Sequence, residues 1–245
     1  MPDADPPAAL APERSTVRWG LGDAAAGWVA AQVGGLLAIT LVLALSGREA
    51  DELDQLPLGW IAVAQLGLWL GLLGAPVLAS RLKGNGLVRD FGLRMLPGDV
   101  PLGLAWGLAL QFGLVLIYIP LYLLTDIDAN DLNEPARAFT DRATDPLGVV
   151  LLVLIVGIGA PIIEEIFYRG LLQRSLIRRF GRWPGIIGTG LIFGASHFEP
   201  LQFPALACFG VAVGYLAVRY DRLGPGIVAH IVFNMAAVVS LISSR

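Results

Sequence analysis

Runs of about twenty apolar residues recur along this chain, and they restrict its fold more than any other feature. The first run, 24–45, is long enough to span a hydrocarbon core of ~30 Å and longer than the apolar core of a signal peptide. Six similar runs follow, at about 58–80, 100–124, 147–172, 183–200, 201–218 and 225–242. With 56% hydrophobic and 15% charged residues, the chain has more apolar side chain than a soluble domain could bury. The sequence therefore predicts an all-α fold, a polytopic membrane helix bundle of about seven transmembrane helices.

The composition divides the chain into three predicted parts. Residues 1–22 are rich in Pro, Ala and charge and lack an apolar period, so we expect a disordered cytoplasmic leader. Residues 23–145 are expected to hold the N-terminal transmembrane helices. Residues 146–245 are expected to form the transmembrane core that carries the chemistry, because the polar interruptions described below fall there.

Basic and acidic residues alternate between the connecting segments. Lys and Arg gather after the second, fourth and sixth runs, whereas the intervening loops are acidic. Since cytoplasmic loops carry the excess of Lys and Arg, we predict a multi-pass protein of the cell membrane with a cytoplasmic N-terminus and the lipid bilayer as its surroundings. Segment 81–95 mixes basic and apolar residues and is either an interfacial segment or an ordinary basic loop. The net charge of −3 provides no field for a phosphate backbone, so no nucleic acid partner is expected.

Three charged residues interrupt the fourth apolar run. Glu164, Glu165 and Arg169 lie inside or at the end of a predicted membrane helix, where ionised groups persist only with partners. Glu165 and Arg169 are four residues apart with the acid first, which favours an ion pair along one helix face. Glu164 is about 100° away around the helix, so it lacks that partner and is suited to proton transfer. The alternative is that both acids lie at the inner interface and pair with the arginines that follow.

The two histidines of the chain also lie in apolar segments. His230 is followed four residues later by Asn234, so an imidazole and a carboxamide share one helix face, and Phe193 and His197 have the same spacing. Each histidine alone is typical of helix packing, and Phe193 is typical of a core residue. Because the histidines, the paired acids and the Asn all fall in the last hundred residues, one shared polar site is predicted.

These motifs resemble those of a known family. EEIFYRG (164–170), Phe193 to His197 and His230 to Asn234 are similar, in this order, to the EExxxR, FxxxH and HxxxN/D signatures of the CPBP intramembrane proteases. That family, also called Abi or type II CAAX endopeptidases, includes the CAAX prenyl proteases and bacterial proteins linked to bacteriocin processing and self-immunity. The resemblance covers about 147–242 and makes residues 146–245 a CPBP-type catalytic core.

The resemblance also implies a role for each residue. Glu164 would activate a water that attacks a peptide carbonyl, with assistance from His197. His230 and Asn234 would hold the developing oxyanion. Glu165 and Arg169 would support the helix, and Phe193 would support the site.

Whether a metal takes part is left open by the sequence. Glu164, His197 and His230 would be enough for a three-ligand zinc site with an open fourth position. However, the chain has no HExxH motif and no evident second carboxylate to orient a ligating imidazole. The family also includes a metal-free arrangement in which the glutamate and histidines act directly, so no cofactor is favoured and zinc stays an alternative.

The leading functional hypothesis is an intramembrane endopeptidase that cleaves near the cytoplasmic membrane face. Its partner would be a peptide or protein substrate, with or without a lipid group, and the high usage of Ala, Gly, Leu and Arg favours a bacterial precursor. One alternative is a proton- or cation-coupled transporter that uses the same acids and histidines. Another is a non-catalytic scaffold that keeps the site without the activity.

Overall fold

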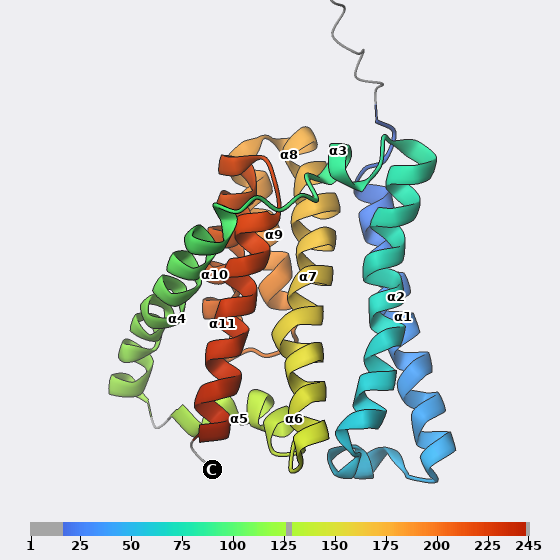
Figure 1. Ribbon diagram of the computed structural model, residues 1–245, viewed down its shortest axis with the longest axis vertical. Helices are drawn as coiled ribbons and strands as arrows, with labels where there is room; N and C mark the ends of the chain where they lie inside the picture. The colour runs from blue at the N-terminus through green and yellow to red at the C-terminus, as the bar shows by residue number, and fades with distance from the viewer. Residues whose placement is uncertain (1–16, 126–128, 244–245) are drawn as a thin grey trace, which may run out of the picture.

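The computed structural model describes residues 17–125 and 129–243, and within these ranges it is helical and contains no strand (Figure 1). The N-terminal half consists of α1 (Leu21–Ser46), the 3-10 helix η1 (Ala50–Gln55), α2 (Leu58–Lys83), α3 (Leu87–Phe91), α4 (Asp99–Leu124) and α5 (Ala129–Thr140). The C-terminal half consists of α6 (Pro146–Leu152), η2 (Val153–Gly159), α7 (Ala160–Glu164), η3 (Glu165–Gln173), α8 (Arg174–Phe180), α9 (Arg182–Ala195), α10 (Phe203–Tyr220) and α11 (Gly224–Ser243). The segments from α6 to α8 follow one another without a break and form one long helix.

The predicted polytopic helical bundle is confirmed, although fewer helices than predicted reach the length of a span. Six helices of the described residues are long and apolar enough to cross a membrane: Leu21–Ser46, Leu58–Lys83, Asp99–Leu124, Pro146–Phe180, Phe203–Tyr220 and Gly224–Ser243. The predicted span 183–200 is helical only as α9, whose 14 residues rise ~21 Å and do not cross a ~30 Å core. The helix stops because the chain turns at Phe198, which has a positive φ of 58°, and Pro200 follows.

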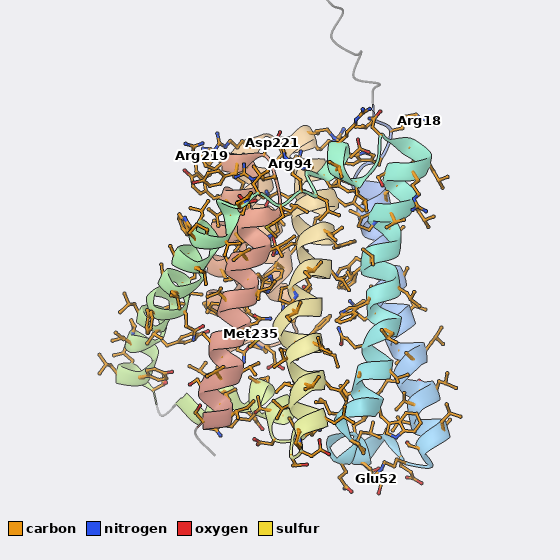
Figure 2. All side chains as sticks on the ribbon, in the orientation of Figure 1. Arg18, Glu52, Arg94, Arg219, Asp221 and Met235 are labelled. Atoms are coloured by element: carbon orange, nitrogen blue, oxygen red, sulfur yellow. The ribbon has the colours of Figure 1, made fainter. Side chains whose placement is uncertain are left out.

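Charge is segregated between the two ends of the bundle, as the alternation of loops predicted. Figure 2 shows Arg18, Arg94 and Arg219 near the end where α1 begins, which we call the basic end, and Glu52 at the opposite end. The hairpin of α9 and α10 returns the chain to the basic end, so α11 finishes at the end opposite the start of α1 (Figure 1).

Ion pairs and an aromatic contact hold the basic end together, and the pair between Lys83 and Asp23, 2.6 Å apart, joins α2 to α1 there. Arg222 forms a 2.6 Å ion pair with the fully buried carboxylate of Asp99, and this hydrogen bonding raises the pKa of Arg222. Arg174 pairs with Asp221 at 2.9 Å. The Arg178 guanidinium lies 3.6 Å from the centroid of the Trp19 ring and donates a 2.6 Å hydrogen bond to the Trp19 carbonyl.

The contact of Trp19 bears on the predicted leader. Residues 1–16 of that leader lie outside the described residues. The remainder, 17–22, differs from the prediction, because Trp19 is buried and α1 already begins at Leu21. The indole ring packs edge-on against Phe91, 4.8 Å between centroids, a contact with a distant segment that local composition does not predict.

Close approach of small residues joins the helices in pairs. Gly34 of α1 and Gly67 of α2 face each other so closely that a Cβ on either would overlap the carbonyl oxygen of the other. A Cβ on Gly210 of α10 would likewise overlap the Gly190 backbone of α9. Such small-residue contacts are typical of helix pairs in membranes, where van der Waals packing replaces the hydrophobic effect.

Candidate functional site

The long helix α6–α8 departs from α-helical geometry on both sides of Glu164. Residues 153–159 and 165–173 are π-helical, with hydrogen bonds to the carbonyl five residues earlier. The Ala160 N–H donates to the Ile155 carbonyl in this pattern, and Pro161 has no N–H to donate to the next carbonyl, that of Val156. The Asn234 side chain donates a 2.9 Å hydrogen bond to the Val156 carbonyl instead. The proline therefore frees an acceptor that fixes Asn234.

The predicted ion pair between Glu165 and Arg169 is confirmed. Their side chains are fully buried and 2.9 Å apart. Arg169 also donates a 3.3 Å hydrogen bond to the Gly210 carbonyl and lies 4.4 Å from the centroid of the Phe193 ring. Glu164 is partly exposed and takes no part in this pair, as the helical spacing predicted.

His230 lies between the two acids. Its Nδ1 is 2.9 Å from Oε1 of Glu165, and its Nε2 is 3.8 Å from Oε2 of Glu164. An ionised carboxylate only accepts hydrogen bonds, so an ionised Glu165 requires the proton on Nδ1. Glu165 thus orients the imidazole, and the prediction that no second carboxylate would do so is wrong. The sequence could not reveal this contact, because the two residues are 65 positions apart on helices whose relative rotation is a tertiary property.

A backbone carbonyl one helical turn earlier in the chain positions the side chain of His197. The residue follows the end of α9, and its Nδ1 lies 2.8 Å from the Phe193 carbonyl. The Ser196 hydroxyl donates to the same carbonyl at 2.8 Å and accepts from the Tyr168 hydroxyl at 2.7 Å. Because a carbonyl can only accept, Nδ1 of His197 carries the proton in this bond and a neutral ring leaves Nε2 as the base. Motif spacing did not identify Tyr168 or Ser196, although both lie within or beside the motifs.

The Phe193 ring connects the two histidines. It lies edge-on to His197 at 4.8 Å and to His230 at 5.8 Å between centroids, and it is almost completely buried. Phe209 of α10, which sequence reasoning did not single out, packs against the His230 ring at 4.8 Å. The aromatic residues therefore fix the ring planes that the polar contacts leave free to rotate.

One cavity of about 320 Å³ contains the predicted catalytic residues. Glu164, His197, His230 and Asn234 all line it, whereas Glu165 and Arg169 lie behind its wall. Away from these four residues the lining is mostly apolar, and α2, α5, α10 and α11 contribute to it. The far end is lined by the α5 residues Pro135, Ala136, Phe139 and Thr140.

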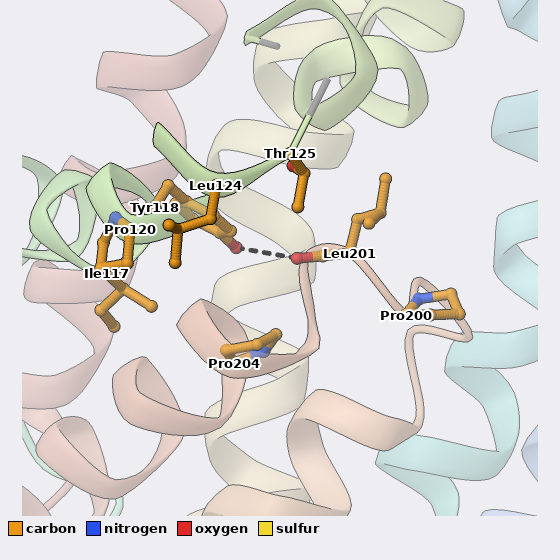
Figure 3. Close-up of a pocket in the computed structure, with 8 residues that line it drawn as sticks. All are labelled: Ile117, Tyr118, Pro120, Leu124, Thr125, Pro200, Leu201 and Pro204. Atoms are coloured by element: carbon orange, nitrogen blue, oxygen red, sulfur yellow. Dashed lines mark hydrogen bonds between the residues drawn. The ribbon is translucent and has the colours of Figure 1, made fainter. Parts of the chain in front are cut away.

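A second hollow, of about 420 Å³, lies between α4 and the loop before α10 (Figure 3). The Tyr118 hydroxyl donates a 3.2 Å hydrogen bond to the Leu201 carbonyl across it. Its walls contain none of the predicted site residues and are formed by Ile117, Tyr118, Pro120, Leu124, Thr125, Pro200, Leu201 and Pro204. The first cavity is therefore the candidate site.

The predicted zinc ligands are not arranged as a metal site. Within residues 17–125 and 129–243, no group of three or more His, Cys, Asp or Glu side chains is placed to hold a metal ion. Nε2 of His230 lies 3.8 Å from Oε2 of Glu164, but His197 does not join them in such a group. In this arrangement the three side chains do not form a zinc site.

Comparison with known proteins identifies the segment that carries the site. Residues 146–236 match the family profile described as type II CAAX prenyl endopeptidase Rce1-like. The seven predicted site residues, from Glu164 to Asn234, all fall inside the matched range. Comparisons with curated proteins and with solved structures each gave no match.

Proposed function

We propose that this protein hydrolyses a peptide bond inside the membrane with Glu164 as general base, because residues 146–236 match the type II CAAX prenyl endopeptidase Rce1-like profile. One observation carries the assignment. Glu164, His197, His230 and Asn234 come from three separate stretches of chain and line one cavity, and Glu164 is the acid of its pair that does not bind Arg169.

In this proposal Glu164 takes a proton from water as the water oxygen bonds to the carbonyl carbon. Glu164 then gives that proton to the amide nitrogen as the C–N bond breaks, so the carboxylate is regenerated. His197 assists through Nε2, because its Nδ1 is engaged with the Phe193 carbonyl. A general base of this kind contributes typically about 10²- to 10⁴-fold in rate.

The oxyanion would be held by His230 and Asn234. Nδ1–H of His230 donates its hydrogen bond to Glu165, so donation to an oxyanion requires a second proton on Nε2, the nitrogen that faces Glu164 and the cavity. Asn234 uses one amide hydrogen for the Val156 carbonyl, which leaves its second hydrogen for the oxyanion. Donors fixed in advance in a water-poor cavity stabilise developing charge most effectively.

The depth of Glu164 agrees with cleavage in the half of the bundle nearer the basic end. Arg174, whose ion pair with Asp221 lies at that end, is ten residues beyond Glu164, or about 15 Å along a helix. Pro146 is about 27 Å away in the other direction. If the basic end faces the cytoplasm, as the positive-inside rule requires, cleavage occurs in the cytoplasmic half of the cell membrane.

The proposed substrate is a bacterial peptide or protein precursor. The cavity has an apolar lining around a few polar groups, so it suits an apolar peptide segment or a lipid group attached to one. We propose that the reaction needs no metal, because the described residues hold no group of three or more His, Cys, Asp or Glu side chains placed around one ion, and Glu164, the histidines and Asn234 suffice for acid-base hydrolysis. Zinc ligation by Glu164, His197 and His230 is the alternative to be tested.

The test is cleavage of a quenched fluorescent CAAX-type peptide, with and without a prenyl chain, by detergent-purified protein before and after extended chelation. Glu164→Gln should lower kcat/KM by at least about 10²-fold, whereas Glu199→Gln, a matched change outside the cavity lining, should not. Full activity of Glu164→Gln would refute the assignment. Loss of activity on chelation, restored by zinc, would refute the metal-free reaction.

The same variants separate the transporter from the protease. Proton- or cation-driven flux across sealed vesicles, lost in Glu164→Gln and unaccompanied by peptide cleavage, would support the transporter. The protease proposal expects no such flux.

A further inference from the structure

One face of α2 points at the helix that carries Glu164. Residues at spacings of three and four form this face: Leu58, Ile61, Gln65, Trp69 and Leu72. The first three of them line the candidate cavity, whereas the opposite face of α2, with Gly67, packs against α1. A polar carboxamide therefore stands on the apolar, inward face of a membrane helix.

The carboxamide of Gln65 has no hydrogen-bond partner among the described residues, although its side chain is half-buried. Other polar side chains around the cavity are satisfied by backbone carbonyls: Thr140 by Arg137, Gln202 by Leu132 and Asn234 by Val156. Both histidines have partners as well. Within the part of the chain that the structure describes, Glu164 and Gln65 are thus the two polar side chains of the lining that form no hydrogen bond.

Packing between α2 and the long helix fixes the depth of Gln65. Trp69 lies against Gly159, where a Cβ would overlap the indole ring, and Gln65 is one helical turn before Trp69. Gln65 is therefore about level with Ile155, which also lines the cavity. Ile155 precedes Glu164 by nine residues, or about 13 Å along the helix, toward α5. An extended peptide covers that distance in about four residues.

We propose that Gln65 is a substrate-binding residue that pairs with the backbone of an extended peptide about four residues from the scissile bond. A carboxamide offers one acceptor and one donor side by side, which matches the N–H and C=O of a peptide unit. A peptide in this apolar cavity loses its water and needs such a partner, and the carboxamide of Gln65 is free to provide one. The inference rests on the proposed peptidase function, since it names where that substrate is held.

The experiment measures binding separately from cleavage. Fluorescently labelled peptides, extended by one to six residues on either side of the scissile bond, are titrated against detergent-purified Glu164→Gln protein with and without Gln65→Leu. Gln111→Leu is the matched control, because Gln111 is a membrane-helix glutamine of α4 outside the cavity lining. On one side of the scissile bond, Kd should fall about tenfold when the peptide reaches about its fourth residue, and Gln65→Leu should abolish that gain.

A modified peptide tests the same contact without altering the protein. N-methylation of the peptide nitrogen opposite Gln65 should raise Kd about tenfold for protein with Gln65 and leave it unchanged for Gln65→Leu. The proposal would be overturned if Kd depended on peptide length equally with and without Gln65. It would also be overturned if Gln111→Leu raised Kd as much as Gln65→Leu.

The outcomes for binding and for cleavage are distinguishable. If cleavage depends on Glu164 but Gln65→Leu leaves the peptide Kd unchanged, the binding role of Gln65 is refuted and the proposed hydrolysis is not. Gln65-dependent binding without cleavage by the wild-type protein would retain the binding residue and refute the hydrolysis.

Discussion

The buried ion pair behind the cavity leads to a quantitative prediction about stability. Arg169→Met removes the cation but leaves the Glu165 carboxylate fully buried, with Nδ1 of His230 as its remaining hydrogen-bond partner. Glu165→Gln removes the anion, so the Arg169 guanidinium keeps only the Gly210 carbonyl, at 3.3 Å, and the Phe193 ring as the contacts described above. Breaking one side of a buried pair strands a charge, so each change should cost about 3–5 kcal/mol of unfolding free energy.

Removing both charges should cost less than the two single changes added together. In Glu165→Leu with Arg169→Met no charge is stranded, and apolar replacement of a buried pair is often neutral. With Glu165→Leu also measured as a single variant, the two single effects together should exceed that of the double variant by at least about 2–3 kcal/mol. Catalysis should not recover with stability, because His230 loses the carboxylate that orients it in every variant without Glu165.

Thermal unfolding in detergent, followed by tryptophan fluorescence, measures these differences. For a chain of this size about 3–5 kcal/mol corresponds to a Tm lower by roughly 6–20 °C. Single variants whose Tm stays within about 2 °C of the wild type, or single effects that add fully in the double variant, would show that the ion pair is not a buried, coupled unit.

Two further predictions concern the basic end and the support of His197. Arg222→Met strands the buried Asp99 carboxylate and should lower stability by about 3 kcal/mol in the same unfolding assay, whereas the exposed Arg219→Met should change it little. Tyr168→Phe removes the hydroxyl that donates to Ser196, and the loss of about 1 kcal/mol in positioning should lower kcat about fivefold with KM unchanged; kcat at the wild-type level would show that this hydroxyl does not support His197.

Local sequence spacing predicted the ion pair but not the contacts between helices. Glu165 and Arg169 are four residues apart, so helical geometry alone brings them together. The contact of Glu165 with His230 and that of Asn234 with Val156 depend on how α11 is rotated and how deep it lies against the long helix. Neither rotation nor depth is encoded in the spacing within one helix.

The sequence also did not predict the π-helical segments on either side of Glu164. A proline in an apolar run predicts a disturbed helix, but not which acceptor takes the place of its missing N–H. The structure shows that the Val156 carbonyl, left without a helical donor, becomes the anchor of Asn234. Gln65 could not be selected from the sequence either, because an amide in an apolar run can point to lipid, to another helix or to a cavity. The structure places it in the cavity lining.

The sequence by itself determined that this chain is a membrane helix bundle with charged ends and a polar cluster in its last hundred residues. Apolar length, loop charge and motif spacing are local properties, and each follows from a short stretch of chain. The tertiary structure decided that α9 stops short of a span, that Glu165 orients His230, and that α2 contributes an amide to the cavity. These features depend on packing between segments far apart in the chain, where close contacts of small residues set the rotation and depth of each helix.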